Sequence, residues 1–545
     1  MFGMEKKIEY KGANMETIQT DVLVIGGGGA GMQAALAARE CGSEVLVVSK
    51  TPTGKSTCTY LSGGGFSVGS QGFSKEDHLE ATLQAGKGLN CKELVHILVE
   101  EASGRIRELE GLGLVGKWGK GRFFVSGKAP SWGAPLTDLL AASLKSHGIS
   151  ALPWGMVFSI VKEDGKVIGA LGYDWRTGKT MAFQSKAIIL ASGGGGALYQ
   201  RHDNPVRITG DGYALAFHAG CSLRDMEFVQ FMPPGLAEPG KPTILIAGSF
   251  CDAGKIVNSA GEEVLEKYKI TERPVAVRAR DRLSLAIFKE EMEGRTVFLD
   301  LRALTDANWP KDNMAQSQHA YIRKGLSCQE KLIRISPMGH FFMGGVAADQ
   351  NGTTEIPGLY AAGEVAGGLH GANRMGGNAL DEVLVFGRRA GVAAAGWAKK
   401  QSRVNNVAAI FQESMKGFSA HKDGLPGGFP PRGIRRMIAE IIWKEGGILR
   451  SGKGLTWVLK SLEQIREQDL PNIQMETPKQ MLEKLEVENA LLVGEMIVRC
   501  ALMREESRGA HFRSDFPEAD DQKWKGNIFL RKSGEGMKLE FRGLQ

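Results

Sequence analysis

The chain has 545 residues, 42% of them hydrophobic, and 68 Lys and Arg against 61 Asp and Glu give it a formal net charge of +7. This length predicts a globular protein of two to four domains. So small a charge on so large a surface, with no long basic run, argues against a nucleic-acid partner. The seven cysteines are scattered, without the CxxC or Cys/His spacing that holds zinc or an iron–sulfur cluster, so we expect no metal site and reduced thiols.

The N-terminal stretch, MFGMEKKIEYKGANMETIQT, contains no apolar run typical of a signal peptide. No later segment offers the roughly 18 uninterrupted apolar residues of a membrane span. We therefore expect a cytoplasmic protein with no transmembrane segment of its own. Docking on a membrane through a partner stays an alternative.

The first strong motif follows directly. Residues 21–25 (DVLVI) form an apolar run of strand length, and residues 32–41 (MQAALAAREC) suit a helix that packs on a sheet. Between them lies GGGGAG, in which Gly26, Gly28 and Gly31 match GxGxxG in the required strand–turn–helix context. Such a turn directs backbone N–H groups and a helix N-terminus at a pyrophosphate.

The next predicted strand, residues 44–50 (EVLVVSK), ends in Ser49 and Lys50. An acidic residue that binds a ribose is usual at this point in nicotinamide enzymes. Its absence argues against a plain nicotinamide dehydrogenase.

Two later segments favour a flavin. Residues 156–185 alternate as a β-meander with turns at Asp164-Gly165 and Thr177-Gly178, and the meander leads into AIILASGG at 187–194. Residues 358–364 (GLYAAGE) give a last apolar strand that ends in Gly-Glu. This order of segments is typical of two-dinucleotide-binding flavoproteins.

Residues 370–380 (HGANRMGGNAL) place an imidazole, a guanidinium and a carboxamide among glycines that cannot pack a core. The pattern indicates backbone close to a ligand, with His370 or Arg374 directed at an anionic group. An ordinary Gly-rich loop is the alternative.

Further motifs lie at 209–231 (TGDGYALAFHAGCSLRDMEFVQF), 340–345 (HFFMGG), 370–391 and 488–517. With them the chain resembles the flavoprotein subunit family of fumarate reductase and succinate dehydrogenase, which includes aspartate oxidase and adenylylsulfate reductase. The resemblance implies an α/β, Rossmann-like two-dinucleotide-binding FAD fold with an inserted capping domain and a helical C-terminal domain. The expected boundaries are 1–240 and 346–404 for the FAD-binding domain, 241–345 for the cap and 405–545 for the C-terminal domain. The spacing of apolar residues from Leu491 to Leu502 is helical.

The resemblance also implies the FAD site. Asp211 and Glu364 are expected near the adenosine and ribose, although Asp211 as a cap of the following helix is an alternative. Ala379 and Leu380 are expected to pass the isoalloxazine. Thr57 stands where many members carry a histidine bonded to FAD, so we expect noncovalent FAD. The full set is Gly26, Gly28, Gly29, Ala30, Gly31, Ser49, Lys50, Ser56, Thr57, Ser62, Gly63, Gly64, Ala191, Asp211, Glu364, Asn378, Ala379 and Leu380.

For catalysis, the resemblance places Arg374 and His340 at positions that bind a substrate carboxylate, and Arg280 at the arginine of proton transfer. An arginine binds a carboxylate through two parallel N–H bonds. For His340, a satisfied core histidine is the alternative.

The substrate pocket departs from the family pattern. Met232 stands for a substrate-binding histidine, while Ile246, Ala247 and Phe250 stand for a Thr, a Glu and an Arg. With the last two the family's proton relay is lost, which leaves Arg280 as an electrostatic clamp. Together with His370, the apolar positions 232, 246 and 250 favour a larger or partly apolar acid over fumarate. As an alternative, Met232 and Phe250 pack inside the cap.

The resulting hypothesis is an FAD-dependent oxidoreductase that transfers a hydride between flavin N5 and a carbon–carbon bond of a carboxylic-acid-type substrate. Because the chain has no cluster ligands, we expect its partner to be a separate iron–sulfur electron-transfer subunit. The rival hypothesis is a non-catalytic FAD subunit that passes electrons between partner proteins. A sulfonucleotide reductase ranks lower, because no segment resembles a sulfonucleotide pocket.

Overall fold

The computed structural model describes residues 16–128, 131–405, 407–420, 428–534 and 536–544. Its centre is a parallel five-stranded sheet in the order β18 (Leu359–Ala361), β11 (Ala187–Leu190), β2 (Val22–Ile25), β3 (Val45–Ser49) and β7 (Ser150–Pro153). Strands β2, β3, β11 and β18 are buried at every position, which explains why they read as continuous apolar runs.

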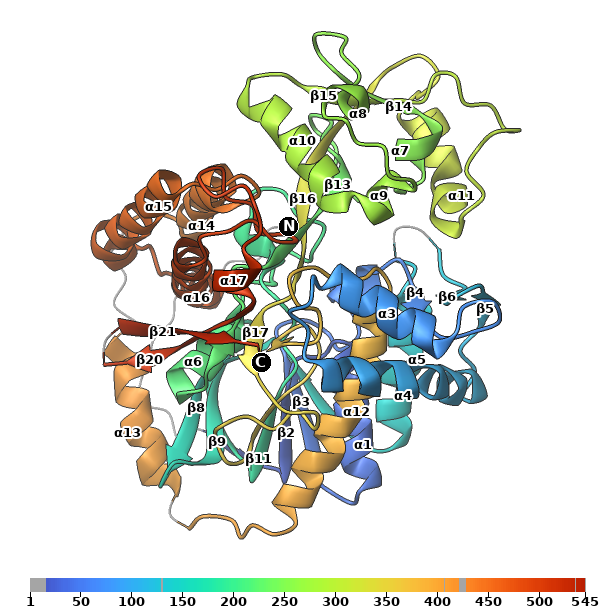
Figure 1. The fold of residues 1–545 in the computed structure, drawn as a ribbon. Helices are drawn as coiled ribbons and strands as arrows, with labels where there is room; N and C mark the ends of the chain where they lie inside the picture. The colour runs from blue at the N-terminus through green and yellow to red at the C-terminus, as the bar shows by residue number, and fades with distance from the viewer. Residues whose placement is uncertain (1–15, 129–130, 406, 421–427, 535, 545) are drawn as a thin grey trace, which may run out of the picture.

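Helices and a second sheet cover this central sheet (Figure 1). On one face α1 (Gly29–Glu40) packs against α12 (Asn378–Ala398) and α5 (Ala134–Ser146), and α12 contacts α4 (Lys92–Gly111). The predicted meander forms a four-stranded sheet in the order β1-β10-β9-β8. Its strands are β1 (Glu16–Gln19), β8 (Gly155–Glu163), β9 (Lys166–Asp174) and β10 (Thr180–Gln184). α6 (Asp211–Ala219) packs on β8.

The cap stands apart from the central sheet in the view of Figure 1. It contains a four-stranded sheet in the order β13 (Val229–Leu236), β16 (Ile333–Phe342), β15 (Val297–Asp300) and β14 (Lys255–Asn258). α10 (Arg280–Met292) packs on β13 and β16. The cap also contains α7 (Phe250–Ala253), α8 (Val264–Lys267), α9 (Val275–Arg278) and α11 (Asn313–Ala320).

The C-terminal part is helical over α13 (Val407–Ala420), α14 (Pro431–Ile441), α15 (Gly452–Gln464) and α16 (Pro478–Met503). The helix predicted over Leu491–Leu502 is thereby confirmed. After α17 (Asp521–Trp524) the chain forms a hairpin, β20 (Gly526–Ser533) and β21 (Gly536–Gly543), which sequence reasoning missed. Its strand β20 pairs with β12 (Leu223–Arg224), so the C-terminus is joined to the FAD-binding part by backbone hydrogen bonds.

The other elements around the site are short. In sequence, α2 (Cys58–Leu61) precedes and α3 (Lys75–Ala85) follows β4 (Gly65–Ser67). β4 forms a three-stranded sheet with β6 (Arg122–Val125) and β5 (Gly116–Gly119), in the order β4-β6-β5. Strands β17 (Gly345–Ala347) and β19 (Ala366–Gly367) belong to the same sheet as β12, in the order β19-β17-β12-β20-β21.

Candidate active site

Three parallel strands end in the predicted glycine turns at one edge of the central sheet. Gly26 follows β2, Ala191 follows β11, and Gly363 and Glu364 follow β18 after Ala362. Because parallel strands share their carboxyl edge, segments far apart in the sequence meet here. The Ala191 amide donates to Ile25 O at 2.8 Å, and a Cβ on Gly26 would lie 2.2 Å from Ala191 O, so only glycine fits between these two strand ends.

The N-terminus of α1 is open to a ligand. Its N-cap, Gly28, provides no side-chain cap, and the first turn contains no acidic residue. A Cβ on Gly28 would meet only Thr57 Cβ, at 3.9 Å, whereas one on Gly31 would lie 2.0 Å from Gly26 O. Gly31 therefore closes the turn, while Gly28 leaves space in front of the first turn of α1. This cradle fits the pyrophosphate of a dinucleotide.

Residues 49–64 form the next wall of the cradle. Thr57 is the N-cap of α2, and its hydroxyl accepts from the Tyr60 amide at 3.1 Å. Ser56 and Gly64 both have a positive φ, and the Ser62 hydroxyl donates to Thr59 O at 2.8 Å. The Gly29 amide of α1 donates to the Thr59 hydroxyl at 3.2 Å, which ties this wall to the GxGxxG turn.

Lys50 and Asp211, both predicted to bind the cofactor, are bonded to each other. Lys50 Nζ lies 2.6 Å from Asp211 Oδ2 and 3.0 Å from Glu486 Oε1 on α16. Gly210, not Asp211, is the N-cap of α6. The alternative of Asp211 as a helix cap is therefore wrong, because its side chain is taken up by Lys50, Thr209 and Asn489.

Glu364 is a buried carboxyl group with one backbone partner. Its Oε1 accepts from the Phe342 amide at 3.1 Å, and its side chain lies against Gly194. Burial raises the pKa of Glu364 to about 8, and the Phe342 amide lowers it only in part. Without a ligand, this carboxyl group is therefore protonated at neutral pH.

This raised pKa predicts that the free energy of unfolding of the FAD-free protein depends on pH. A glutamate in the unfolded chain ionises near pH 4.3, so between that pH and the folded pKa of about 8 the native state holds one more proton. The free energy of unfolding of the FAD-free protein then falls as the pH rises through this window. We expect Glu364→Gln to stabilise the FAD-free protein by about 1–3 kcal/mol at pH 8 and not at pH 4. Urea unfolding at both pH values measures this, and equal gains at both would contradict the assignment.

Within residues 370–380 the two predicted cations have different surroundings. His370 is 2% exposed and its Nε2 lies 3.1 Å from Glu382 Oε2, so it faces a carboxylate of the protein itself. The Arg374 guanidinium lies 4.4 Å from the ring centre of Phe341. Asn378 anchors the start of α12, because its side chain bonds His78 and Thr82 at 2.9 Å each.

Arg374 and Arg280 lie close together and are both buried, at 6% and 8% exposure. Arg374 Nη2 donates to Gln230 Oε1 at 3.0 Å, and its Nε has no partner. Arg280, the first residue of α10, directs Nη1 at Arg374 O at 3.5 Å. Burial, followed by the charge of Arg280, lowers the pKa of Arg374 to about 9, so its guanidinium remains charged at neutral pH. Burial also lowers the pKa of Arg280.

His340 lies on β16, one residue before the Phe341 ring that Arg374 covers. Its Nδ1 lies 2.6 Å from Asp203 Oδ2, and its side chain is 24% exposed. Among the described residues, Nε2 of His340 has no hydrogen-bond partner. A carboxylate that holds one ring nitrogen leaves the other directed at a ligand.

The apolar positions divide between two environments. Ile246 and Phe250 are 0% exposed and belong to the hydrophobic core of the cap, where the Phe250 ring lies 5.0 Å from that of Trp309. The surroundings of Phe250 match the alternative of a packing residue, and Ile246 packs in the same core. Met232 is partly exposed and pairs with Met338 across β13 and β16.

Several residues around these cations were missed by sequence reasoning. Gln230 connects Arg374 with Asn373, and the Asn373 amide donates to both oxygens of Asp281 at 2.7 and 2.9 Å. Asp203 and Glu382 hold the two histidines. Gln230 lies inside a motif quoted above, but nothing in a single sequence shows which polar residue faces which arginine.

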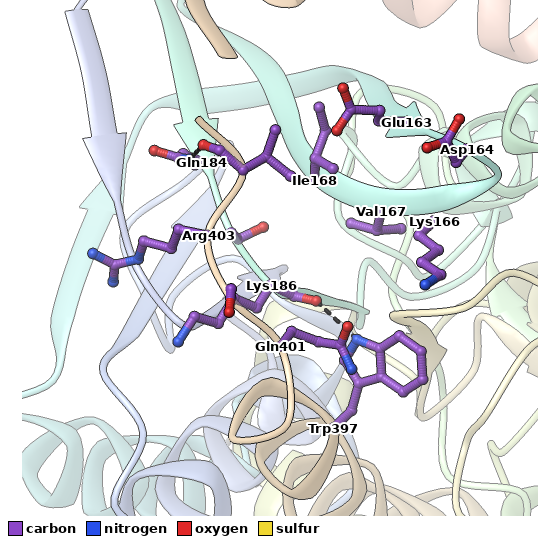
Figure 2. A pocket seen from close by; sticks show the side chains of 13 residues that line it. Glu163, Asp164, Lys166, Val167, Ile168, Gln184, Lys186, Trp397, Gln401 and Arg403 are labelled. Atoms are coloured by element: carbon purple, nitrogen blue, oxygen red, sulfur yellow. Dashed lines mark hydrogen bonds between the residues drawn. The ribbon is translucent and has the colours of Figure 1, made fainter. Parts of the chain in front are cut away.

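A separate cavity of about 310 Å³ lies at the opposite edge of the sheet, where β11 begins (Figure 2). Lys186 and Arg403 line it, and both are ion-paired with Asp21, at 2.9 and 3.5 Å. The Trp397 indole donates to Lys186 O at 3.1 Å. Lys186 and Arg403 thus share a counter-ion within the chain.

The geometry defines an FAD-dependent oxidoreductase fold, and comparisons with known proteins agree. Residues 21–380 match the FAD binding domain family, and residues 435–545 match the fumarate reductase flavoprotein C-terminal family. The chain belongs to the fumarate reductase/succinate dehydrogenase flavoprotein family, so the expected fold class, family and FAD-binding domain are confirmed.

Named relatives span nearly the whole chain. It is 34% identical to one subunit of the fumarate reductase (CoM/CoB) of Methanothermobacter marburgensis, over 95% of this chain and 98% of that protein. It is 30% identical to the Escherichia coli fumarate reductase flavoprotein subunit, over 97% and 94%. A structure of E. coli quinol fumarate reductase superposes with a TM-score of 0.87 at 28% identity, covering 97% of both chains. Adenylylsulfate reductase from Archaeoglobus fulgidus shares the fold, with a TM-score of 0.79 at 20% identity over 100% and 99%.

Two kinds of feature are absent from the part of the chain that the structure describes. These residues contain no helix with the length and apolarity that a membrane crossing requires. Nor do they contain a group of three or more His, Cys, Asp or Glu side chains placed to hold a metal ion.

Proposed function

We propose that the chain catalyses hydride transfer between flavin N5 and a carbon–carbon bond of a carboxylic-acid-type substrate. FAD, when bound, supplies the hydride chemistry. The proposal rests mainly on two buried arginines, Arg280 and Arg374. No carboxylate of the described chain lies within 4.0 Å of either guanidinium group. Arg374 lies on the segment that leads directly into α12, whose first turn holds the predicted isoalloxazine contacts Ala379 and Leu380.

In this proposal Arg374 binds a substrate carboxylate and Gln230 fixes the direction of its guanidinium. His340, whose Nδ1 is held by Asp203, directs Nε2 at the same acid. Arg280 stabilises negative charge that develops on the substrate in the transition state. The cap, which carries Arg280 and His340, would exclude water when it closes on the FAD-binding part.

The rival is an FAD subunit that passes electrons between partner proteins without a substrate of its own. A subunit that only passes electrons does not need two buried arginines without a carboxylate partner near the expected position of the flavin ring. Their presence favours catalysis. Electron supply from a separate iron–sulfur subunit is part of the proposal, because the seven scattered cysteines do not show the spacing that holds a cluster. The Methanothermobacter relative is itself named as one subunit of its reductase.

One experiment separates the two functions. The purified chain, loaded with FAD and reduced without oxygen, is mixed with fumarate, larger enoic acids, aromatic enoic acids and enoyl thioesters while flavin absorbance is followed. Reoxidation by an acid supports catalysis. No reoxidation by any of them, with rapid electron exchange to a copurifying iron–sulfur protein, would instead support the subunit that only passes electrons.

We also propose that FAD is held noncovalently. Thr57 has no nucleophilic ring nitrogen, and its hydroxyl caps α2 by accepting from the Tyr60 amide. Acid precipitation of the FAD-loaded protein is expected to release all of the yellow colour into the supernatant. Colour retained in the pellet after washing would contradict noncovalent attachment.

A further inference from the structure

A third guanidinium group lies beside the two arginines already described. Arg122, on β6, donates from Nη1 to Gly376 O and to the Ser67 hydroxyl. Arg280 approaches the same glycine, because its Nη2 lies 3.3 Å from the position of a Cβ on Gly376. Arginines from β6, α10 and the 370–380 segment thus converge on one turn.

These three arginines have only neutral partners in the described chain. The hydrogen bonds of Arg122, Arg280 and Arg374 end on backbone carbonyls, the Ser67 hydroxyl or the Gln230 amide. No carboxylate of the described residues lies within 4.0 Å of any of them. The buried Arg504 differs, since Glu227 and Glu506 lie 2.7 and 2.9 Å from it.

The carboxyl groups that act on these arginines through space are engaged elsewhere: Glu382 and Asp203, near Arg374, hold His370 and His340. Asp281 accepts the Asn373 amide with both oxygens. Asp381 is fully buried, accepts from the Ser67 amide at 3.1 Å and leaves Oδ1 without a partner. Burial raises the pKa of Asp381 well above its ordinary value, which disfavours the charged form of its carboxyl group. Buried cations without a counter-ion are unfavourable unless a ligand neutralises them.

We propose that Arg122 is a third anion-binding residue of the substrate site and binds a second anionic group of the substrate. This rests on the proposed function and narrows its substrate class to acids with two anionic groups, such as a dicarboxylate or a carboxylate with a sulfonate or phosphate. In the cap, positions 246, 247 and 250 are apolar and buried, so they offer no side-chain donor to that group. Arg122 supplies one from the FAD-binding part. Its hydrogen bonds within the described chain all come from Nη1, which leaves Nε and Nη2 for a two-point contact.

The test compares two acids of similar size and different charge, fumarate and crotonate, on the oxidised FAD-loaded protein, with binding followed by the change in flavin absorbance. We expect Arg122→Gln to weaken fumarate about 10–100-fold and crotonate less than about 3-fold, because only the dianion uses Arg122. Lys120→Gln removes an exposed charge from the same hairpin as the matched control, and is expected to change neither. Arg122→Lys keeps the charge without the planar fork and is expected to restore part of the fumarate affinity.

The outcomes are distinguishable. Unchanged fumarate binding in Arg122→Gln, or equal losses for both acids with a lowered melting temperature, would overturn the role of Arg122 and leave the proposed function intact. If an acid of the larger panel reoxidises the flavin of wild-type protein but fumarate binds no more tightly than crotonate, the role of Arg122 is overturned. If wild-type protein binds neither acid and no acid of the larger panel reoxidises its flavin, the proposed function itself fails. Should Arg122→Gln not fold, a fumarate-selective loss in Arg122→Lys supports the role, and its absence overturns it.

Discussion

Arg374→Gln is expected to lower kcat/KM for every acid substrate about 10²–10³-fold while FAD stays bound. The change removes a buried charge and its two-point contact with a carboxylate, which is the kind of stabilisation that electrostatic catalysis depends on. FAD is retained because the GxGxxG turn and α1 lie on other segments of the chain. Steady-state turnover with the best acid of the panel, together with the ratio of flavin to protein, measures both effects.

The control for this variant lies on α12. Arg388→Gln removes a partly exposed arginine paired with Glu40 at 2.7 Å, and surface pairs of this kind contribute little. Its activity is expected to stay within about 2-fold of wild type. If Arg374→Gln retained wild-type turnover, the substrate would bind elsewhere and the proposed site would be wrong.

The FAD-binding part could be predicted because its signals are local. An apolar run of strand length, a glycine turn and an alanine-rich helix stand next to one another between residues 21 and 41, and β2 and α1 form there. The β20–β21 hairpin could not be predicted in the same way. It is stable in this place because β20 pairs with β12, about 300 residues earlier in the chain, and a single sequence carries no signal of that pairing.

The side chains around Arg374 and His340 could not be predicted for the same reason. Motifs point to Arg374 and His340, but the groups that orient them, Gln230 and Asp203, lie 144 and 137 residues away in sequence. Ile246 and Phe250 were expected to line the pocket because they stand at positions where other family members carry substrate-binding residues. Apolar side chains on short cap segments bury themselves against Trp309 and its neighbours, and an equivalence of positions does not show which way such a side chain packs.

Gly28→Val is expected to abolish FAD binding and leave the FAD-free fold intact. Gly28 has φ −80° and ψ −176°, an extended backbone that any residue adopts, and no protein atom other than Thr57 Cβ lies within 4 Å of its added Cβ. A valine would thus project into the space in front of the α1 N-terminus, where the pyrophosphate is expected. We expect affinity for FAD to fall more than about 10²-fold, with the melting temperature of the FAD-free protein changed by less than about 2 °C.

Two other glycines make this result specific. Gly31→Val places its Cβ 2.0 Å from Gly26 O, so the turn itself must open and the FAD-free protein is expected to lose stability as well. Gly104→Val puts the same side chain on an exposed position of α4 with open space around it, and FAD binding is expected to be unchanged. Flavin fluorescence titration and thermal melts of the three FAD-free variants separate these cases. Wild-type FAD affinity in Gly28→Val would mean that the dinucleotide does not lie on the α1 N-terminus, because a valine at this position would fill the space that the phosphates need there.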